Sequence, residues 1–474
     1  MVKSIADVPN QKECIKSGLL PNGLLTTKEK WSYGLGDLSS NLVWGFIGSY
    51  LLYFYTDVAL IPVAATGTLF LVARVLDAFI DPVIGGFVDR TNTKMGRTIP
   101  YMRYAIIPLA AVLILTFSYV DTGTAGKLIY AYITYIVVGI VYSVVNVPYG
   151  SLMTLMTRNS AEKAKLASLR VAGAAIGSIA ITALAMPLVN LLGNGNKRVG
   201  FMLTAAVFGV IGIIGFEIVA RNCKERYLEM PKVGQTSTQR PKVSFLSTYK
   251  SVIKNRAWVT TVIFALLLFI RIGIIVAITI YFAIYVLKSP ALISVLLPLL
   301  YVGQLISTLF SAQVIGKLGH RKANIIANIG FIVSYLILPF TEHIIPLFIA
   351  VYLIGNVIGA ISAASVFGMN ADAVDYNEWK FGQRSEGTLY AGYSFATKVG
   401  MAIGSAVAGY ALTWIGYSAA HITPSVVSGL NVLYFAIPLV LTVLMLITTL
   451  FYNLDDKHAQ IVEDLNARSK EQEK

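Results

Sequence analysis

The sequence has little charge for its length. Asp, Glu, Lys and Arg make up only 13% of its 474 residues, whereas 56% are hydrophobic and the mean hydropathy is +0.69. Soluble proteins carry about 25% charged residues, so this deficit excludes a globular enzyme and places most of the chain in lipid. The hydrophobic stretches are roughly 18–30 residues long, and about 20 residues of helix cross a bilayer core. They are continuous rather than alternating, which favours membrane helices over a transmembrane barrel.

Residues that carry enzymatic and metal chemistry are also scarce. The two cysteines, Cys14 and Cys223, lie far apart in polar segments without metal or redox spacing, so we expect free thiols facing a reducing cytoplasm. The sequence contains no Gly-Lys-Ser/Thr phosphate loop, no clustered His/Cys set and no nucleophile elbow. Residues 1–30 lack the apolar region of a cleavable signal peptide. We therefore expect neither an enzyme nor an ATP-driven pump, and no resident metal or cofactor.

Twelve hydrophobic stretches predict an all-α polytopic membrane protein. Their expected bounds are 34–56, 62–86, 99–119, 127–157, 163–192, 199–220, 256–287, 290–315, 322–341, 343–370, 387–416 and 429–453. The longest polar connection follows the sixth stretch, and 85–90 resembles 316–322 as a weak internal repeat. Two six-helix halves around a site at the membrane midplane are the architecture of major-facilitator transporters. The expected parts are a cytoplasmic N-terminal segment (1–30), a first half (31–220), a linker (221–255), a second half (256–453) and a cytoplasmic tail (454–474).

Positive charges gather in alternate connections between these stretches. The formal net charge is +14, but the cations cluster in short connections, which indicates membrane topology rather than nucleic-acid binding. The connections near 56–61, 121–126, 289–290 and 341–342 hold few cations. The positive-inside rule places the cation-rich set in the cytoplasm. We expect both termini to be cytoplasmic, with the protein in a bacterial cytoplasmic membrane and lipid around it.

The second stretch carries three charged residues on one helical face. Arg74, Asp77 and Asp81 stand at i, i+3 and i+7. A charge inside a membrane helix costs about 2.5–3.5 kcal/mol on insertion scales. Two close carboxylates disfavour double ionisation, so one is suited to carry a proton. This face predicts a proton or cation-coupling site, with a weak sodium site at the two acids as a variant; the alternative is a buried ion pair between helices.

Two cations stand alone in the second half. Lys398 lies near the middle of the eleventh stretch, where it is predicted to act as a counter-charge to the acids of the second stretch; the alternative is a side chain that snorkels to the interface. Arg271 lies in the seventh stretch. It is predicted either to pair with an acid of the first half or to bind substrate oxygens.

Polar and aromatic side chains deep within the stretches are candidates for sugar binding. They are Asn41, Trp44, Tyr142, Asn146, Arg170, Arg271, Gln304, Tyr390, Tyr393 and Ser394. Sugars are bound by paired hydrogen bonds and by aromatic faces, and Pro148 after Asn146 predicts a kink that opens the helix. The alternative for each residue is a hydrogen bond between helices.

Charged residues near the helix ends are candidates for gating. They are Asp37, Asp89, Arg90 and Arg97 in the first half, and Asp372, Asp375, Arg384 and Glu386 in the second. Asp37 is alternatively a cap at the start of the first helix, and the other residues are alternatively part of solvated loops.

Six motifs together resemble the glycoside–pentoside–hexuronide:cation symporter family. They are Tyr-Thr-Asp (55–57), Ala-Arg-Val-Leu-Asp-Ala-Phe-Ile-Asp-Pro (73–82), Gly-Arg-Thr-Ile-Pro-Tyr (96–101), Val-Asn-Val-Pro-Tyr-Gly-Ser-Leu (145–152), Ala-Asp-Ala-Val-Asp-Tyr-Asn-Glu (371–378) and Arg-Ser-Glu-Gly (384–387). The resemblance runs from about Trp31 to the last stretch. It implies a major-facilitator bundle and cation-coupled sugar uptake by alternating access, with the cation held at Asp77 and Asp81 and with Lys398 in the family's lysine position.

The sequence departs from the melibiose branch of that family at three positions. Asn41, Asn146 and Gly150 stand where that branch has two acids and a tryptophan. The absence of an acid at the position of Asn146 weakens a sodium site and favours proton coupling. The motifs around the first and fourth stretches resemble the xyloside and glucuronide permeases, which implies symport of a glycoside such as isoprimeverose or another α-xyloside, with a glucuronide as the alternative. A sugar-binding membrane sensor and a lysolipid carrier are the alternatives of another class.

Overall fold

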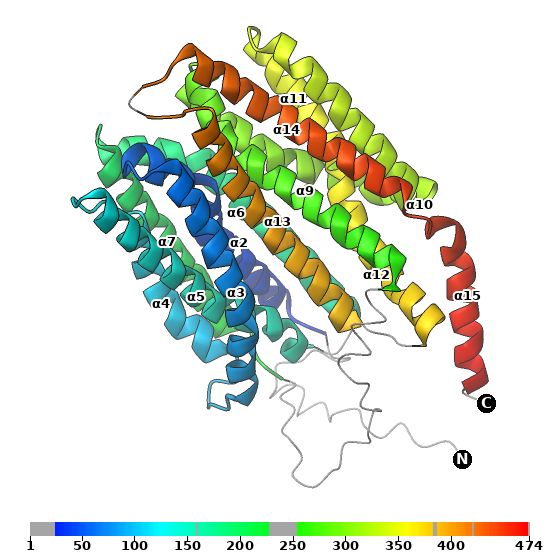
Figure 1. Cartoon of the computed structure of the whole chain (residues 1–474). Coiled ribbons are helices and arrows are strands. Elements are labelled where there is room, and N and C mark those ends of the chain that lie inside the picture. Colours follow the sequence, from blue (N-terminus) through cyan, green and yellow to red (C-terminus); the bar gives the residue numbers. More distant parts are fainter. Residues whose placement is uncertain (1–23, 158–159, 227–253, 383–385, 420, 473–474) are drawn as a thin grey trace. The chain divides into compact units, whose positions relative to one another are not determined.

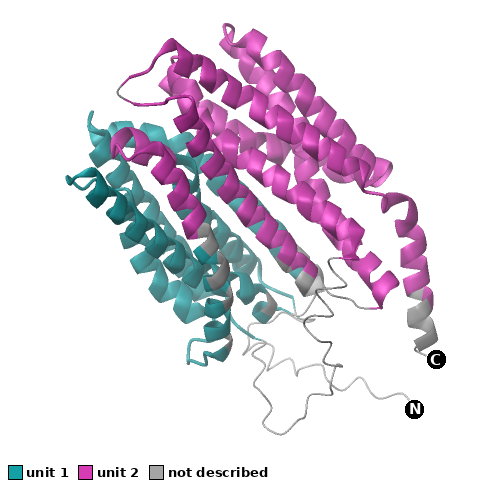
Figure 2. Ribbon diagram, viewed as in Figure 1, with its two compact units in different colours: residues 1–51, 75–234 teal, residues 52–74, 235–474 magenta. Residues whose placement is uncertain are grey.

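The computed structural model describes residues 24–157, 160–226, 254–382, 386–419 and 421–472. These form two compact units (Figure 2). Unit 1 is Met1–Leu51 and Val75–Gly234, and unit 2 is Leu52–Arg74 and Gln235–Lys474. Unit 2 therefore includes residues 52–74, which the sequence assigns to the first half. Cys14, most of the predicted linker (227–253) and Arg384 lie outside the described residues.

The described chain is built from helices, labelled in Figure 1. The first six are α2 (Thr27–Tyr53), α3 (Val63–Arg90), α4 (Ile99–Thr116), α5 (Thr124–Met156), α6 (Ser160–Gly193) and α7 (Lys197–Asn222). The later ones are α9 (Arg256–Tyr281), α10 (Ile293–Ile337), α11 (Ile345–Gly359), α12 (Ile361–Phe381), α13 (Glu386–Trp414), α14 (Pro424–Leu450) and α15 (Asp455–Gln472). Two π-helical turns, η1 (Phe54–Val58) and η2 (Phe282–Val286), extend α2 and α9, and two short 3₁₀ turns, η3 (Pro290–Leu292) and η4 (Leu338–Thr341), flank α10.

The hydropathy of these helices confirms an all-α membrane protein. Within the described residues, nine spans are long and apolar enough to cross a membrane. The longest span, Pro290–Thr341, holds two of the predicted stretches. The two are separated by a break in α10 at Gly319, whose φ of +78° is not helical. All twelve predicted stretches overlap an observed helix.

Aromatic side chains fill the core of unit 1. Phe46 of α2 stacks against Phe117 at the end of α4, with ring centres 4.2 Å apart, and meets Phe208 of α7 edge-on at 5.3 Å. All three are buried. Since lipid tails are as apolar as these rings, close packing rather than escape from water holds such helices together.

Unit 2 combines aromatic stacking with glycine contacts. Phe282 stacks on Tyr434 of α14 at 3.9 Å. Helix α13 packs on α9 through Gly400 and Gly404, where an added Cβ would come within 2.8 Å of the Leu266 carbonyl oxygen and 2.5 Å of the Ile270 carbonyl oxygen. Small residues therefore allow two backbones to approach more closely than side chains would permit.

Three element ends differ from the sequence-based expectation. Helix α2 begins at Thr27, so Asp37 lies well inside it and does not cap it. Helix α12 continues to Phe381, so Asp372 and Asp375 are helical rather than part of a solvated loop. The polar tail contains α15, which follows α14 (Figure 1). Ile461 of α15 and Leu454, just before it, are buried and pack with Met369 of α12.

Candidate functional site

A charged cluster joins three helices of unit 1. Arg170 Nε of α6 donates to Asp37 Oδ2 of α2 over 2.5 Å. The Tyr149 hydroxyl of α5 donates to the Tyr33 carbonyl oxygen at 2.5 Å and lies 3.2 Å from Asp37 Oδ2. The guanidinium of Arg170 also lies 5.0 Å from the centre of the Tyr149 ring. Arg170, predicted to bind sugar, is thus engaged by Asp37.

Two glycines allow this cluster to form. A Cβ on Gly36 would come within 2.3 Å of the Tyr149 ring, and a Cβ on Gly173 within 2.2 Å of the Gly34 carbonyl oxygen. The Gly-Leu-Gly sequence before Asp37 therefore lets α5 and α6 close against α2.

Three of the predicted sugar-binding residues meet one turn further along α2. The Tyr142 hydroxyl lies 2.8 Å from Ser40 Oγ, and its ring stacks on Trp44 with centres 4.4 Å apart. Asn41 donates to the Asp37 carbonyl oxygen at 2.8 Å and accepts from Ser178 at 3.4 Å. Asn41, Trp44 and Tyr142 are all half-buried. The result is a ledge of aromatic faces, hydroxyls and an amide, which is suited to a sugar ring.

The two acids of α3 lie along α5 in the same unit. A Cβ on Gly139 would lie 2.9 Å from Asp77 Oδ1, and a Cβ on Gly85 would lie 4.0 Å from Val147. Asp77 therefore pairs with Gly139, and Gly85, eight residues later on α3, pairs with Val147, eight residues later on α5. The two helices thus run parallel, and Asp81 lies level with Ser143. Asp77 and Asp81 are half-buried.

This register places the acids beside two predicted sugar residues. Tyr142 and Asn146 follow Gly139 and Ser143 on α5 by one turn each, and Asn146 is half-buried. The carboxylate of Asp77 and the Tyr142–Trp44 ledge therefore occupy neighbouring turns. The side chains of Arg74 and Asp89 lie outside the described residues, and Arg90 is exposed at the end of α3.

The predicted site residues of α13 have different environments within unit 2. Lys398 and Tyr390 are exposed and Ser394 is half-buried. Tyr393 is 3% exposed and packs with Leu268 of α9 and Met445 of α14. In this conformation its ring lies inside the helix bundle, and its predicted role in sugar binding stays a prediction.

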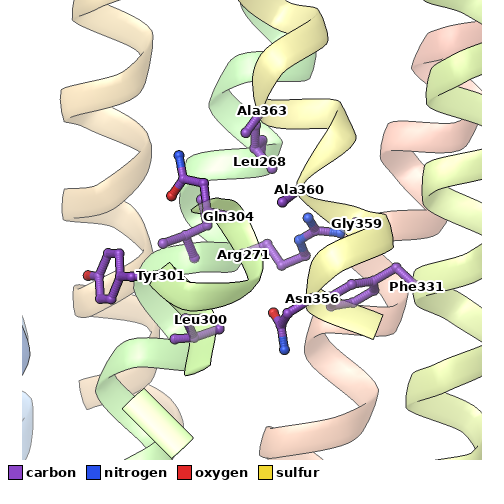
Figure 3. Close-up of a pocket in the computed structure, with 11 residues that line it drawn as sticks. Leu268, Arg271, Leu300, Tyr301, Gln304, Phe331, Asn356, Gly359, Ala360 and Ala363 are labelled. Atoms are coloured by element: carbon purple, nitrogen blue, oxygen red, sulfur yellow. The ribbon is translucent and has the colours of Figure 1, made fainter. Parts of the chain in front are cut away.

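Arg271 and Gln304 line a small cavity inside unit 2 (Figure 3). Its volume is about 60 Å³, and Tyr301, Asn356 and Phe331 also line it. Arg271 is 4% exposed, whereas Gln304 is exposed. No carboxylate of the described residues contacts Arg271, so the predicted pairing with an acid of the first half is not seen there.

Two gating candidates belong to a histidine–carboxylate cluster. Asp372 lies 3.5 Å from His320 Nε2 and 3.4 Å from His458 Nε2, and His458 also lies 3.4 Å from Asp375. His458 is on α15, so this cluster fastens the C-terminal helix to α12. The side chain of Glu386 lies outside the described set.

The comparison with known families agrees with this fold and this chemistry. Residues 32–456 match the family model described as MFS/sugar transport protein. The chain belongs to the MFS/sugar transport family.

Relatives give the class within this family, and a solved structure agrees with the fold. A putative glycoside/cation symporter of Escherichia coli (strain K12) is 34% identical over 442 residues, covering 92% of this chain and 94% of the relative. An isoprimeverose transporter of Lactiplantibacillus pentosus is 32% identical over 459 residues, covering 95% and 94%. The crystal structure of a bacterial homologue of the human lysosomal transporter Spinster, inward-facing and unoccupied, aligns with a TM-score of 0.66 at 14% identity, covering 91% of this chain and 96% of that one. This MFS sugar transporter is therefore a multi-pass membrane protein of the glycoside/cation symporter class, and not an enzyme.

The sequence reasoning assigned no role to a second acid cluster of this MFS sugar transporter. Asp57 Oδ1 accepts from Tyr285 at 2.9 Å and from Tyr417 at 2.6 Å, and Thr56 Oγ1 lies 2.7 Å from the Tyr281 hydroxyl. All of these residues lie in unit 2. The sequence did offer one signal for this cluster: an acid within the Tyr-Thr-Asp motif, in a connection that holds few cations.

A second missed residue anchors the start of α4. Glu225 accepts from the backbone N–H groups of Arg97 and Thr98, each at 2.6 Å, and from the Thr98 hydroxyl. A carboxylate at a helix N-terminus is favoured by the helix dipole. Arg97 is predicted as a gating residue, and the structure shows its backbone N–H donating to Glu225. No side-chain pattern in the sequence indicates such a backbone contact.

Proposed function

We propose that this MFS sugar transporter is a proton-coupled symporter of a glycoside such as isoprimeverose or another α-xyloside. It works by alternating access in a bacterial cytoplasmic membrane, with both termini in the cytoplasm. Asp77 is the proton carrier and Asp81 its partner. Sodium at the same acids is the variant, and Lys398 acts as a counter-charge.

One observation carries this proposal. The half-buried Asp77 carboxylate packs against Gly139, one turn from Tyr142, whose ring and hydroxyl join Trp44 and Ser40. A titratable acid therefore lies next to a surface suited to a sugar. Protonation of the acid removes its charge, which changes the hydrogen bonding and the field that a sugar on the ledge would meet.

The choice of proton over sodium is supported by the donor set. The affinity of a cation site rises with the number of charged oxygen ligands, and Asn146 and Ser143 supply neutral amide and hydroxyl groups rather than a third carboxylate near Asp77 and Asp81. Within the described residues, no group of three or more acidic, histidine or cysteine side chains is arranged to hold a metal ion.

The coupling is tested in de-energised membrane vesicles. Addition of an α-xyloside is expected to alkalinise the medium, because each sugar enters with a proton. Asp77→Asn is expected to abolish the pH signal while sugar exchange persists, since the amide mimics the protonated acid. Asp121→Asn, an exposed acid in a connection, is the matched control and keeps both activities. Sugar uptake that never moves protons, or a pH signal that survives Asp77→Asn, contradicts the proposal.

The sugar itself is tested by counterflow. A panel of xylosides, glucuronides and galactosides is offered to loaded proteoliposomes. We expect exchange of an α-xyloside, while preferred exchange of a glucuronide supports the alternative in which Arg271 recognises a carboxylate.

A further inference from the structure

The guanidinium of Arg271 is buried in unit 2 without a counter-charge among the described residues. It is 4% exposed, and its contacts are with neutral groups: Nη1 donates to Thr442 Oγ1 at 2.9 Å, and the guanidinium carbon lies 4.0 Å from the Phe331 ring centre. An intramembrane arginine costs several kcal/mol unless it is paired. A hydroxyl and an aromatic face offset only part of that cost.

One donor of this guanidinium remains unused. Arg271 Nε is buried and makes no hydrogen bond within the described part of the chain. Arginine offers five N–H donors in a fixed fork that matches anions. A buried donor left unbonded costs about 1–3 kcal/mol, so the arrangement is stabilised by any acceptor that reaches it.

The space beside Arg271 has the size of a small anion. The cavity holds about 60 Å³, and a water-sized body needs roughly 10–15 Å³ of such space. This is room for a halide or a carboxylate group, and not for a whole sugar. The Gln304 amide and the Tyr301 ring lie on α10, while Asn356 and Gly359 on α11 lie across the guanidinium (Figure 3).

We propose that the Arg271 cavity is a binding site for one small anionic group, either a free halide or the carboxylate of an acidic sugar. Positive charge, an unused donor and a matching volume meet at one place. The exposed Gln304 marks the side from which the group enters. The inference concerns binding alone and holds whether or not the proton coupling proposed above is correct.

The test uses purified full-length protein in detergent at constant sodium and ionic strength. Sodium bromide and sodium glucuronate each replace a bulky organic sulfonate, and neutral glucose is the sugar control. We expect a saturable rise in melting temperature with bromide, and bromide located beside Arg271 by anomalous scattering. Arg271→Met is expected to weaken binding about tenfold or more, the loss that follows from removing a charge-assisted hydrogen bond.

Two further variants keep the test decisive. Arg256→Met removes an exposed arginine of the same helix and should bind like the wild type. Ala363→Leu fills the cavity but keeps Arg271, so it should lose anion binding even if Arg271→Met fails to fold. Bromide binding without glucuronate binding assigns the site to a halide, and glucuronate binding that glucose does not reproduce assigns it to a sugar carboxylate.

One pattern of results contradicts the proposed anion site. If both salts shift every variant alike, or shift none, the anion site is refuted. Uptake of an α-xyloside by the same wild-type protein, reconstituted into proteoliposomes, then shows whether the proposed symport stands independently of it.

Discussion

At the residue scale, Asp37 and Arg170 form an interdependent ion pair of unit 1. Their side chains are 12% and 29% exposed, so removal of either leaves the other charged and poorly solvated. Breaking a buried pair in this way costs about 3–5 kcal/mol. We expect Asp37→Asn and Arg170→Met each to lower the free energy of unfolding by about 3 kcal/mol, with loss of sugar uptake.

A double-mutant cycle separates this pair from general packing. The double variant Asp37→Asn/Arg170→Met leaves no unpaired charge, so its stability loss should be smaller than the sum of the single losses. Thermal unfolding in detergent measures all four proteins. Additive losses would show that the ion pair contributes nothing beyond the individual side chains.

Glu162 gives unit 1 a pH-dependent stability. Burial alone would raise the pKa of this carboxyl, but hydrogen bonds from Lys30, the Leu25 backbone and Lys165 outweigh it and lower the pKa to about 2. The group has an ordinary value of 4.5. Because the folded pKa is lower than the unfolded one, the stabilisation is present above about pH 4.5 and is lost as the pH falls toward 2.

Glu162→Gln tests this contribution. We expect the wild type to exceed the variant by about 3 kcal/mol near pH 7, since one pKa unit corresponds to about 1.4 kcal/mol. The difference should shrink as the pH falls from 4.5 to 3. Melting curves of both proteins over this pH range measure it, and a difference that does not change with pH contradicts the assignment.

At the element scale, the two halves of the chain repeat one turn. The π-helical turns η1 and η2 are each followed by a residue with positive φ, Leu60 (59°) and Lys288 (53°). Backbone bonds repeat as well: Ala59 and Leu287 donate to Phe54 and Phe282. Proline follows two residues after each positive φ. The repeated geometry supports an internal duplication of the kind that transporters use.

This turn predicts a side-chain preference. A β-branched residue is strained at positive φ, whereas glycine is not. Lys288→Val should therefore destabilise the protein by about 1–2 kcal/mol, while Lys288→Gly should be close to neutral. Thermal unfolding of the two variants compares them, and equal melting temperatures would refute strain at this turn.

Hydropathy predicts the elements well and the contacts poorly. Apolar stretches of membrane length located every helix through α14, because lipid leaves a backbone few other choices. The ends were less predictable: α2 begins early at Thr27, and α15 is a polar helix whose few apolar residues, such as Ile461 and Leu465, resemble those of a loop although they pack with α12.

The sequence likewise predicts the residues of the candidate site better than their contacts. The one-face spacing of Asp77 and Asp81 and the polar residues Asn41, Trp44 and Tyr142 came from the sequence alone. That Arg170 binds Asp37 and that Tyr393 is buried depends on helix rotation, which residue types do not reveal.

At the scale of the whole molecule, the Asp57 cluster is placed to control access. It joins the end of the first predicted stretch to the ends of the seventh and eleventh, all within unit 2. The three connections hold few cations, so the positive-inside rule predicts that they lie on the outer side. In the proposed alternating access, opening of that side would separate Tyr285 and Tyr417 from Asp57, so we expect these two bonds to stabilise an outward-closed state.

Tyr417→Phe removes one of these bonds and should shift the population toward the outward-open state. A hydrogen bond to a charged group contributes about 1.5–3 kcal/mol, which corresponds to a shift of about tenfold or more. Ala283, which is fully buried in η2, is replaced by cysteine in a background without other cysteines as the reporter. A membrane-impermeant maleimide added from outside should label it faster in Tyr417→Phe than in Tyr119→Phe, which removes an exposed tyrosine hydroxyl bonded to Asp121. Equal labelling rates in the two variants would mean that the Asp57 cluster is not the element that keeps the outer side closed.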